Sequence, residues 1–159
     1  MSCRRLGWVV VGFALMLNAG TASAQAQAAP YGPAINLEAA KRVAAAAVAE
    51  ARKNNWAMAF AITDPAGELM SFEKIDGTQA ASIGIAQDKA RSSARFKRAT
   101  KVFQDALATG GAELRYLGLA GVVPAEGGIP IVMNGAIGVS GGTGAQDAQC
   151  AAVGVAAVK

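Results

Sequence analysis

Two turn signals, each lying between segments of strand length, constrain the fold of this chain more than any other feature of its sequence. Asp64-Pro65-Ala66-Gly67 fits a type I turn, because Asp, Pro and Gly stand at the first, second and fourth positions. Asn134-Gly135 is the strongest short signal for a β-hairpin. Strands are expected on both sides of each turn, at residues 57–63, 68–75, 129–133 and 136–140. The chain is therefore expected to form two hairpins.

Helical segments precede, separate and follow these hairpins. The predicted helices cover residues 36–53, 79–96, 100–108 and 144 to about 158, with Asn36, Thr78 and Thr143 as predicted N-caps. Residues 112–126 fit a short helix or turn near Tyr116, followed by a small strand at 121–123. Hairpins joined by helices are typical of an α+β fold, in which helices pack on an antiparallel sheet. The lack of alternating single strands and helices argues against a parallel Rossmann-type sheet.

The N-terminus has the three zones of a secretory signal peptide. Arg4 and Arg5 form a basic start, residues 6–17 are apolar, and Ala22-Ser23-Ala24 places small residues where a signal peptidase cuts. We expect a signal peptide at 1–24, a loose leader at 25–35 and one domain at 36–159. The apolar run is shorter than the ~20 residues of a membrane-spanning helix, so no stable membrane anchor is expected. The expected location is periplasmic or secreted, by the general or the twin-arginine route.

The residue counts exclude several chemistries. The 159 residues include no histidine, so neither a Ser-His-Asp triad nor a histidine zinc site nor a histidine-ligated haem can form. Cleavage near Ala24 would remove Cys3 and leave Cys150 alone, most simply as a buried apolar residue. It would also remove two arginines, leaving thirteen cations against eleven acids, a net charge of +2. This balance gives no support to a nucleic-acid role.

Three segments could bind a ligand, and each also has a plain structural interpretation. Arg91, Arg95 and Arg98 have the i, i+4, i+7 spacing of one helix face, which could bind carboxylates or phosphates but is more often a solvated face. The glycine-rich residues 135–142 lack the lysine of a phosphate loop, and suit either a ligand or subunit contact or a tight hairpin with a helix entry. Glu126, before two glycines and a strand-starting proline, is either a polar contact or an exposed carboxylate.

Five short motifs, in this order, resemble the GlcG/HbpS-like family over residues 36–159. They are Ala61-Ile62-Thr63-Asp64 with Gly67, Lys74-Ile75-Asp76-Gly77, Asp88-Lys89-Ala90 with Thr100, Gly127-Gly128-Ile129-Pro130-Ile131, and residues 135–141 with Asp147. The family includes a secreted haem-binding protein, a protein of glycolate-utilisation operons and the C-terminal domain of a corrinoid adenosyltransferase. The resemblance implies a profilin-like layered fold and homo-oligomers from dimers to octamers. It also implies haem or another tetrapyrrole as the ligand.

The motifs and the arginine face together define a predicted ligand-binding set. Its members are Arg91, Arg95, Arg98, Thr100, Glu126, Gly127, Gly128, Pro130, Gly138 and Ser140. No catalytic residue is assigned, and no metal ligand is identified. Without histidine, the donors to a haem iron by residue type are Met58, Met70, Met133, Cys150, Tyr31 and Tyr116, each of which is more often a core or surface residue.

The expected function is therefore that of an exported, non-enzymatic, self-assembling binding protein for haem or another tetrapyrrole. One alternative is an enzyme or accessory protein acting on a small organic acid, for which the polar candidates are Asp64, Lys89, Glu126 and Asp147. A third interpretation is a structural role, in which the glycine segments only pack subunits.

Overall fold

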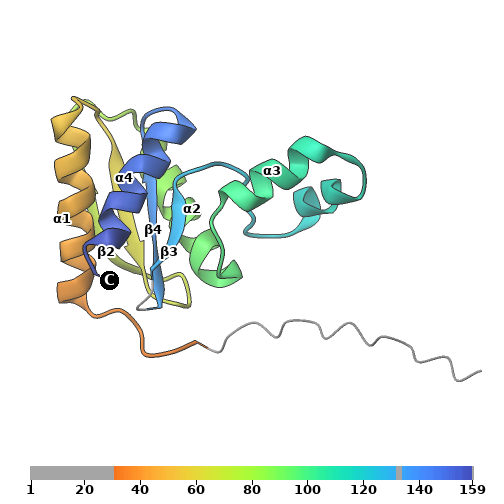
Figure 1. Cartoon of the computed structure of the whole chain (residues 1–159), viewed down its shortest axis with the longest axis horizontal. Coiled ribbons are helices and arrows are strands. Elements are labelled where there is room, and N and C mark those ends of the chain that lie inside the picture. The colour runs from red at the N-terminus through yellow and green to blue at the C-terminus, as the bar shows by residue number, and fades with distance from the viewer. Residues whose placement is uncertain (1–30, 132–133, 159) are drawn as a thin grey trace, which may run out of the picture.

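The computed structural model describes residues 31–131 and 134–158 as one α+β domain (Figure 1). In chain order, its elements are α1 (Leu37–Lys53), β1 (Ala59–Thr63), β2 (Leu69–Lys74), α2 (Ala81–Phe96), α3 (Lys101–Thr109), the 3₁₀ helix η1 (Gly111–Gly118), β3 (Gly128–Ile131), β4 (Gly135–Ser140) and α4 (Gly144–Ala156). The predicted signal peptide, leader residues 25–30 and Met133 lie outside the described residues.

The four strands form one antiparallel sheet in the order β2-β1-β4-β3. Helices α1 and α4 lie side by side on one face of the sheet, and α2 covers the other (Figure 1). The predicted fold class, an antiparallel sheet with helices packed on it, is confirmed. The two hairpins place β1 and β4 at the centre, so the pairing Ala61↔Gly138 joins the two halves of the chain.

The two faces of the sheet carry side chains of different size. Phe60 and Ile62 of β1 are fully buried with Ile137 and Val139 of β4 in the main core, against α1 and α4. Ala59 and Ala61 alternate with them and face α2. This alternation follows from the two-residue period of a strand. Because the side chains on this face are small, α2 can lie very close to the sheet.

Gly138 of β4 is the point of closest approach. A Cβ added there would collide with the carbonyl of Ala86 and the backbone nitrogen of Ala90, both in α2. Neither interpretation given for the glycine-rich segment describes Gly138, because the backbone that approaches it so closely belongs to α2 of the same chain.

The helix caps and the first turn follow the predictions except at Thr78. The second turn differs from the predicted Asn134-Gly135 pair, because Gly135 already pairs with Ile131 and begins β4, and only Asn134 of the two takes a left-handed conformation, with φ 57°. Asn36 accepts a hydrogen bond from the Ala39 amide at 2.8 Å, and Thr143 caps α4 in a capping box with Gln146. The predicted Thr78 cap is wrong, because α2 begins at Ala81, two residues later than predicted, and has no side-chain cap. The Thr78 hydroxyl instead donates to the Ile75 carbonyl at 2.6 Å, which fixes the preceding turn.

Residues 101–118 project from the body of the domain as an arm (Figure 1). The arm is anchored by Phe103, which is fully buried and makes edge contacts with the rings of Phe96 and Tyr116. The small strand predicted at 121–123 does not form; these residues are a turn and an extended return to β3. The arm and this return expose four large apolar side chains, Val102, Leu114, Leu117 and Leu119.

None of the helices within 31–131 and 134–158 combines the length and the apolarity that a membrane crossing requires.

The close approach of α2 to β4 gives a direct test. Gly138→Ala should lower the free energy of unfolding by about 1–3 kcal/mol, because the added methyl overpacks the contact with Ala86 and Ala90. Gly84→Ala is the matched control. Gly84 lies in α2, the helix that Gly138 contacts, and nothing lies within 4 Å of an added Cβ there, so this change should raise the free energy of unfolding by about 0.5–1 kcal/mol. Urea unfolding of both variants measures the difference, and equal effects would contradict the packing described here.

Candidate functional site

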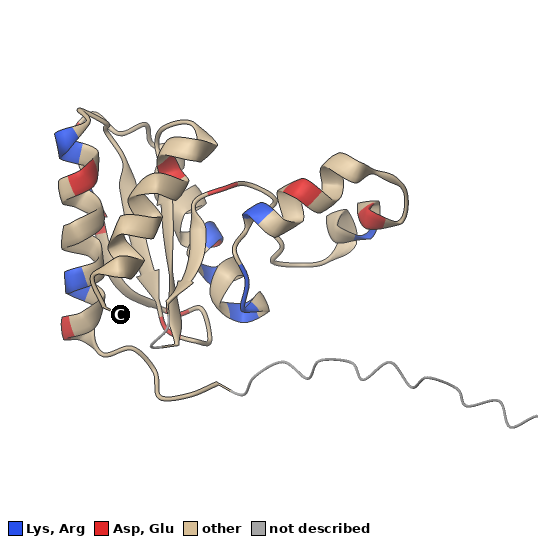
Figure 2. Ribbon diagram, viewed as in Figure 1, with Lys and Arg blue, Asp and Glu red and all other residues tan. Residues whose placement is uncertain are grey.

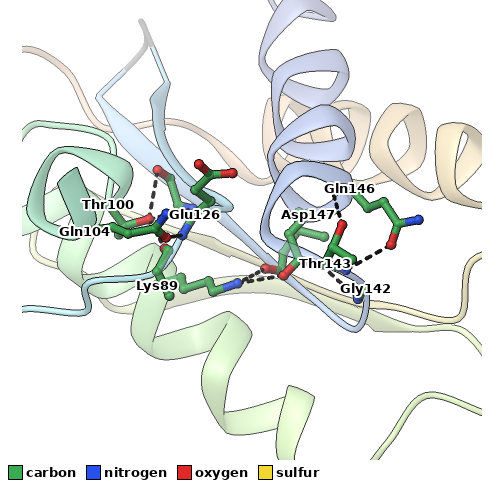
Figure 3. A network of polar contacts seen from close by, with 11 residues as sticks. Lys89, Thr100, Gln104, Glu126, Gly142, Thr143, Gln146 and Asp147 are labelled. Carbon is green, nitrogen blue, oxygen red and sulfur yellow. Dashed lines mark hydrogen bonds and ion pairs between the residues drawn. The ribbon is translucent and has the colours of Figure 1, made fainter. Parts of the chain in front are cut away.

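A buried ion pair links the two helical layers across the sheet (Figure 3). Lys89 of α2 donates from Nζ to Oδ2 of Asp147 in α4 at 2.7 Å, and each side chain is only 4% exposed. The same ammonium donates to the carbonyl of Val139 at 3.0 Å. The sequence pointed to Lys89 and Asp147 separately, as polar candidates for acid–base chemistry. Their pairing could not be read from it.

The carboxylate of Asp147 has further donors. Its Oδ1 accepts from the amide of Gly142 at 3.0 Å. Burial raises the pKa of the Asp147 carboxyl above its ordinary value, while the Lys89 ammonium and the amides of Gly142 and Gly141 act in the opposite direction. The pair thus neutralises two charges inside the domain, and neither group is open to a substrate.

Two glycines make room for this pair beside β3. At Gly127, where φ is 106°, an added Cβ would meet the Asp147 side chain and the Val139 carbonyl. At Gly128, it would lie 2.6 Å from both the Lys89 carbonyl and the Thr100 methyl. Like Gly138, these glycines of the predicted set therefore contact the interior of the protein itself.

Thr100 has the same inward role. Its side chain is fully buried, and its hydroxyl donates to the Ala125 carbonyl at 2.5 Å and accepts from the Gly128 amide at 3.0 Å. Both functions of the hydroxyl are used to hold the chain that leads into β3. The predicted ligand contact of Thr100 has no open surface in this arrangement.

Glu126 and Ser140 lie near the ion pair, at the same end of the sheet. Glu126 is half-buried: its carboxylate lies 3.1 Å from the Lys101 ammonium, and its amide donates to the Gln104 side chain at 3.1 Å (Figure 3). Ser140 is buried at the end of β4. Pro130, in the edge strand β3, lies at a separate surface site described below. The predicted set is therefore divided between two places.

The predicted arginine face is wrong for Arg98. Helix α2 ends at Phe96, where Lys97 takes a left-handed conformation with φ 52°, so Arg98 lies beyond the helix. Its Nε donates to the Phe96 carbonyl at 3.2 Å. Arg95 remains on α2, donates to the Ala66 carbonyl at 2.6 Å and thereby holds the first hairpin turn against the helix.

Arg91 lies one turn earlier on α2 than Arg95. Its guanidinium pairs with the Asp88 carboxylate at 3.1 Å, and its side chain contacts the hairpin turn at Gly67. Figure 2 shows that basic residues gather at the C-terminal end of α2 and along its link to α3. This concentration of positive charge borders a surface pocket.

The pocket lies where the end of α2 meets the β3–β4 hairpin and the N-terminal segment. Its volume is about 120 Å³, and it is lined by Tyr31, Pro65, Ala94, Lys97, Pro130, Ile131, Asn134 and Gly135. This volume is smaller than the roughly 300–1,000 Å³ typical of small-molecule sites, so the pocket can hold only one part of a larger ligand. The walls are mostly apolar, with one cation, one phenol and one amide, which suits a largely apolar ligand with an anionic group.

Tyr31 forms a wall of this pocket and was not expected in an ordered position. Its hydroxyl donates to the Arg95 carbonyl at 3.1 Å, and the Lys97 ammonium lies 3.7 Å from its ring centroid. The segment is tied to the second hairpin, since the Ile35 amide donates to the Asn134 carbonyl at 3.2 Å and the Asn134 amide group donates to the Pro33 carbonyl at 3.2 Å. The end of the predicted loose leader therefore packs against the domain.

Among the described residues, no group of three or more Cys, Asp and Glu side chains could hold a metal ion.

The buried pair predicts a large asymmetry between single and double substitutions. Lys89→Met or Asp147→Asn should each lower the free energy of unfolding by about 3–5 kcal/mol, because each leaves one buried charge without its partner. The double variant should lose clearly less than the sum of the two. Denaturant unfolding measures all three.

The exposed pair of Arg42 and Glu38 in α1, at 2.9 Å, is the matched control. Its removal should cost only about 0.3–0.5 kcal/mol. If the Lys89 and Asp147 variants behave like this surface pair, the account of the interior is incorrect.

Comparison with known proteins agrees with this fold. The model of the family described as "Haem degrading protein HbpS-like" matches residues 35–156. Protein GlcG of Escherichia coli K12 is 34% identical over 105 residues, which span 64% of this chain and 77% of GlcG. An uncharacterised 15.0 kDa protein of Citrobacter freundii, encoded between dhaT and dhaS, is 34% identical over 120 residues, or 71% of this chain and 84% of that protein.

Solved structures of related proteins have the same architecture. The Klebsiella pneumoniae protein ORFY superposes with a TM-score of 0.75 at 28% identity, covering 82% of this chain and 94% of ORFY. A PduOC:haem complex superposes with a TM-score of 0.72 at 25% identity, covering 79% and 96%. HbpS superposes with a TM-score of 0.73 at 27% identity, covering 86% and 99%. The family model spans most of the chain, so the resemblance seen in the motifs is confirmed and the chain belongs to the HbpS-like family.

Proposed function

We propose that this protein binds haem in the pocket at the end of α2. The observation that carries the proposal is the composition of that pocket, in which apolar walls are combined with the Lys97 ammonium and the Tyr31 phenol. Membership of the HbpS-like family and the likeness to a PduOC:haem complex support haem as the ligand.

The residues present fit one edge of the macrocycle. Pro65, Ala94 and Pro130 offer flat apolar surface to the porphyrin, which is a planar apolar ring. Lys97 at the wall and Arg95, half-exposed on the same helix, offer positive charge to propionates. A cavity of about 120 Å³ covers only one edge of the ring, so the rest would face solvent or a second copy of the chain. Bound haem would supply a redox-active iron that the side chains do not provide.

We favour binding without turnover for this chain. Of the four polar candidates for acid–base work, Lys89 and Asp147 neutralise each other inside the domain. Glu126 is paired with Lys101, and Asp64 accepts the Glu68 amide at 2.8 Å within the first hairpin turn. These contacts give a structural reason for each of the four, and they support the binding function over the organic-acid alternative.

Export and self-assembly belong to the same proposal. The sequence of residues 1–24 supports removal of a signal peptide and a periplasmic or secreted mature chain. The arm and its return to β3 support self-assembly, because Leu117 is 70% exposed and Leu114 is 50% exposed. A second copy of the chain is the partner proposed for these side chains.

One experiment tests export and assembly together. The full chain is expressed in a bacterial host, and native mass spectrometry is applied to the protein from the periplasm and the medium. The expected mass is that of a homo-oligomer of chains beginning near Gln25, and Leu117→Asp should shift it towards the monomer because a charge would be buried at the interface. A chain that retains residues 1–24, or a monomeric native protein, would contradict the corresponding part of the proposal.

Haemin titration tests the binding function. The purified protein should show a saturable change in the Soret band at micromolar haemin. Lys97→Glu should weaken binding about tenfold, equivalent to about 1.4 kcal/mol, because it replaces an attraction to propionate by a repulsion. Lys41→Glu, an exposed position on α1, makes the same charge change on the other side of the sheet and should leave binding unchanged. Absence of a saturable change in the unaltered protein would refute haem binding.

A further inference from the structure

We infer that the phenolate oxygen of Tyr31 is the ligand that this protein gives to the haem iron. The inference rests on the proposed haem-binding function and deepens it. It begins from a chemical gap: the chain has no histidine, and the other usual protein donors to haem iron are Cys, Met and Tyr.

The sulfur donors among the described residues lie inside the domain. Met58 and Cys150 are fully buried in the main core, on the face of the sheet covered by α1 and α4. Burial raises the pKa of the Cys150 thiol to about 11, so the thiolate that would bind iron is disfavoured. Met70 of β2 packs against the same core. None of these three lines the pocket at the end of α2.

Tyr116, the other tyrosine, is committed to the arm. Its ring makes an edge contact with Phe103 at a centroid distance of 5.2 Å, and the Arg115 guanidinium lies 4.9 Å from its ring centroid. The arm projects away from the sheet, and Tyr116 does not line the pocket (Figure 1).

Tyr31 differs from these residues in position and in electrostatic surroundings. It is 51% exposed and lines the pocket. The Lys97 ammonium lies 3.7 Å from its ring centroid and lines the same pocket. Its hydroxyl donates to a surface carbonyl, that of Arg95, and this single hydrogen bond is what ligation must replace.

The step is balanced without a further reactant. The phenol O–H bond breaks, its proton passes to solvent, and an oxygen–iron bond forms while the iron remains ferric. The hydrogen bond to Arg95 is lost in the same step. Residues 33–35, tied to Asn134 by two hydrogen bonds, keep Tyr31 near the pocket during the exchange.

The test compares haemin with iron-free protoporphyrin IX on three forms of the full chain: unaltered, Tyr31→Phe and Tyr116→Phe. With haemin, the unaltered protein and Tyr116→Phe should share a phenolate-to-iron charge-transfer band and phenolate modes in the resonance Raman spectrum. Tyr31→Phe should lose both signals and bind haemin about tenfold more weakly. Iron-free protoporphyrin, followed by its fluorescence, should bind all three forms equally, because no bond to iron is involved.

The outcomes separate the inference from the function beneath it. If the unaltered protein binds neither porphyrin, haem binding itself fails. If it binds haemin without the phenolate signals, or if Tyr31→Phe keeps them, only the role of Tyr31 fails. If Tyr31→Phe also loses iron-free protoporphyrin, Tyr31 is a pocket wall and not an iron ligand, which likewise overturns the inference. Thermal unfolding of the Tyr31→Phe variant should match that of the unaltered protein, since the position is half-exposed.

Discussion

The arrangement of this domain depends on the ion pair between Lys89 and Asp147, which joins helices on opposite faces of the sheet. A charged pair inside a protein is tolerated only when both members have their hydrogen bonds satisfied. Here the Val139 carbonyl accepts a further hydrogen bond from Lys89, and the Gly142 amide donates one to Asp147. Space for the pair comes from Gly127 and Gly128, where no side chain fits. The glycine motif and the two charged residues are therefore one structural unit.

This unit changes the meaning of the family motifs. Thr100, the paired glycines and Asp147 would look like a ligand site if considered as a sequence pattern. In the folded chain they fill one another's space and satisfy one another's hydrogen bonds. The proposed binding site lies instead at the opposite end of the sheet, where the second hairpin, the end of α2 and the N-terminal segment line an open pocket. Pro130 alone among the predicted set lies there.

The sequence predicted those features that depend on local chemistry. Asp64 and Gly67 define the first turn, Asn134 the second, and Asn36 and Thr143 the caps, because each acts on backbone within a few residues. The ion pair could not be predicted, since its members are 58 residues apart and meet only after α2 and α4 have packed on the sheet. Arg98 was misplaced because the left-handed Lys97 ends α2 earlier than the spacing of arginines indicated. Tyr31 was named only as a donor by residue type, and its place in the pocket could not be predicted because its neighbours have the composition of a leader.

The central claim, that haem is held at the end of α2 and not beside the ion pair, is tested most directly by a crystal structure of the protein with haemin. The account predicts a macrocycle against Pro130 and Lys97, with the iron next to the Tyr31 oxygen and the Lys89–Asp147 pair intact. A macrocycle lodged between Thr100 and Gly128, with that pair broken to admit it, would contradict the account.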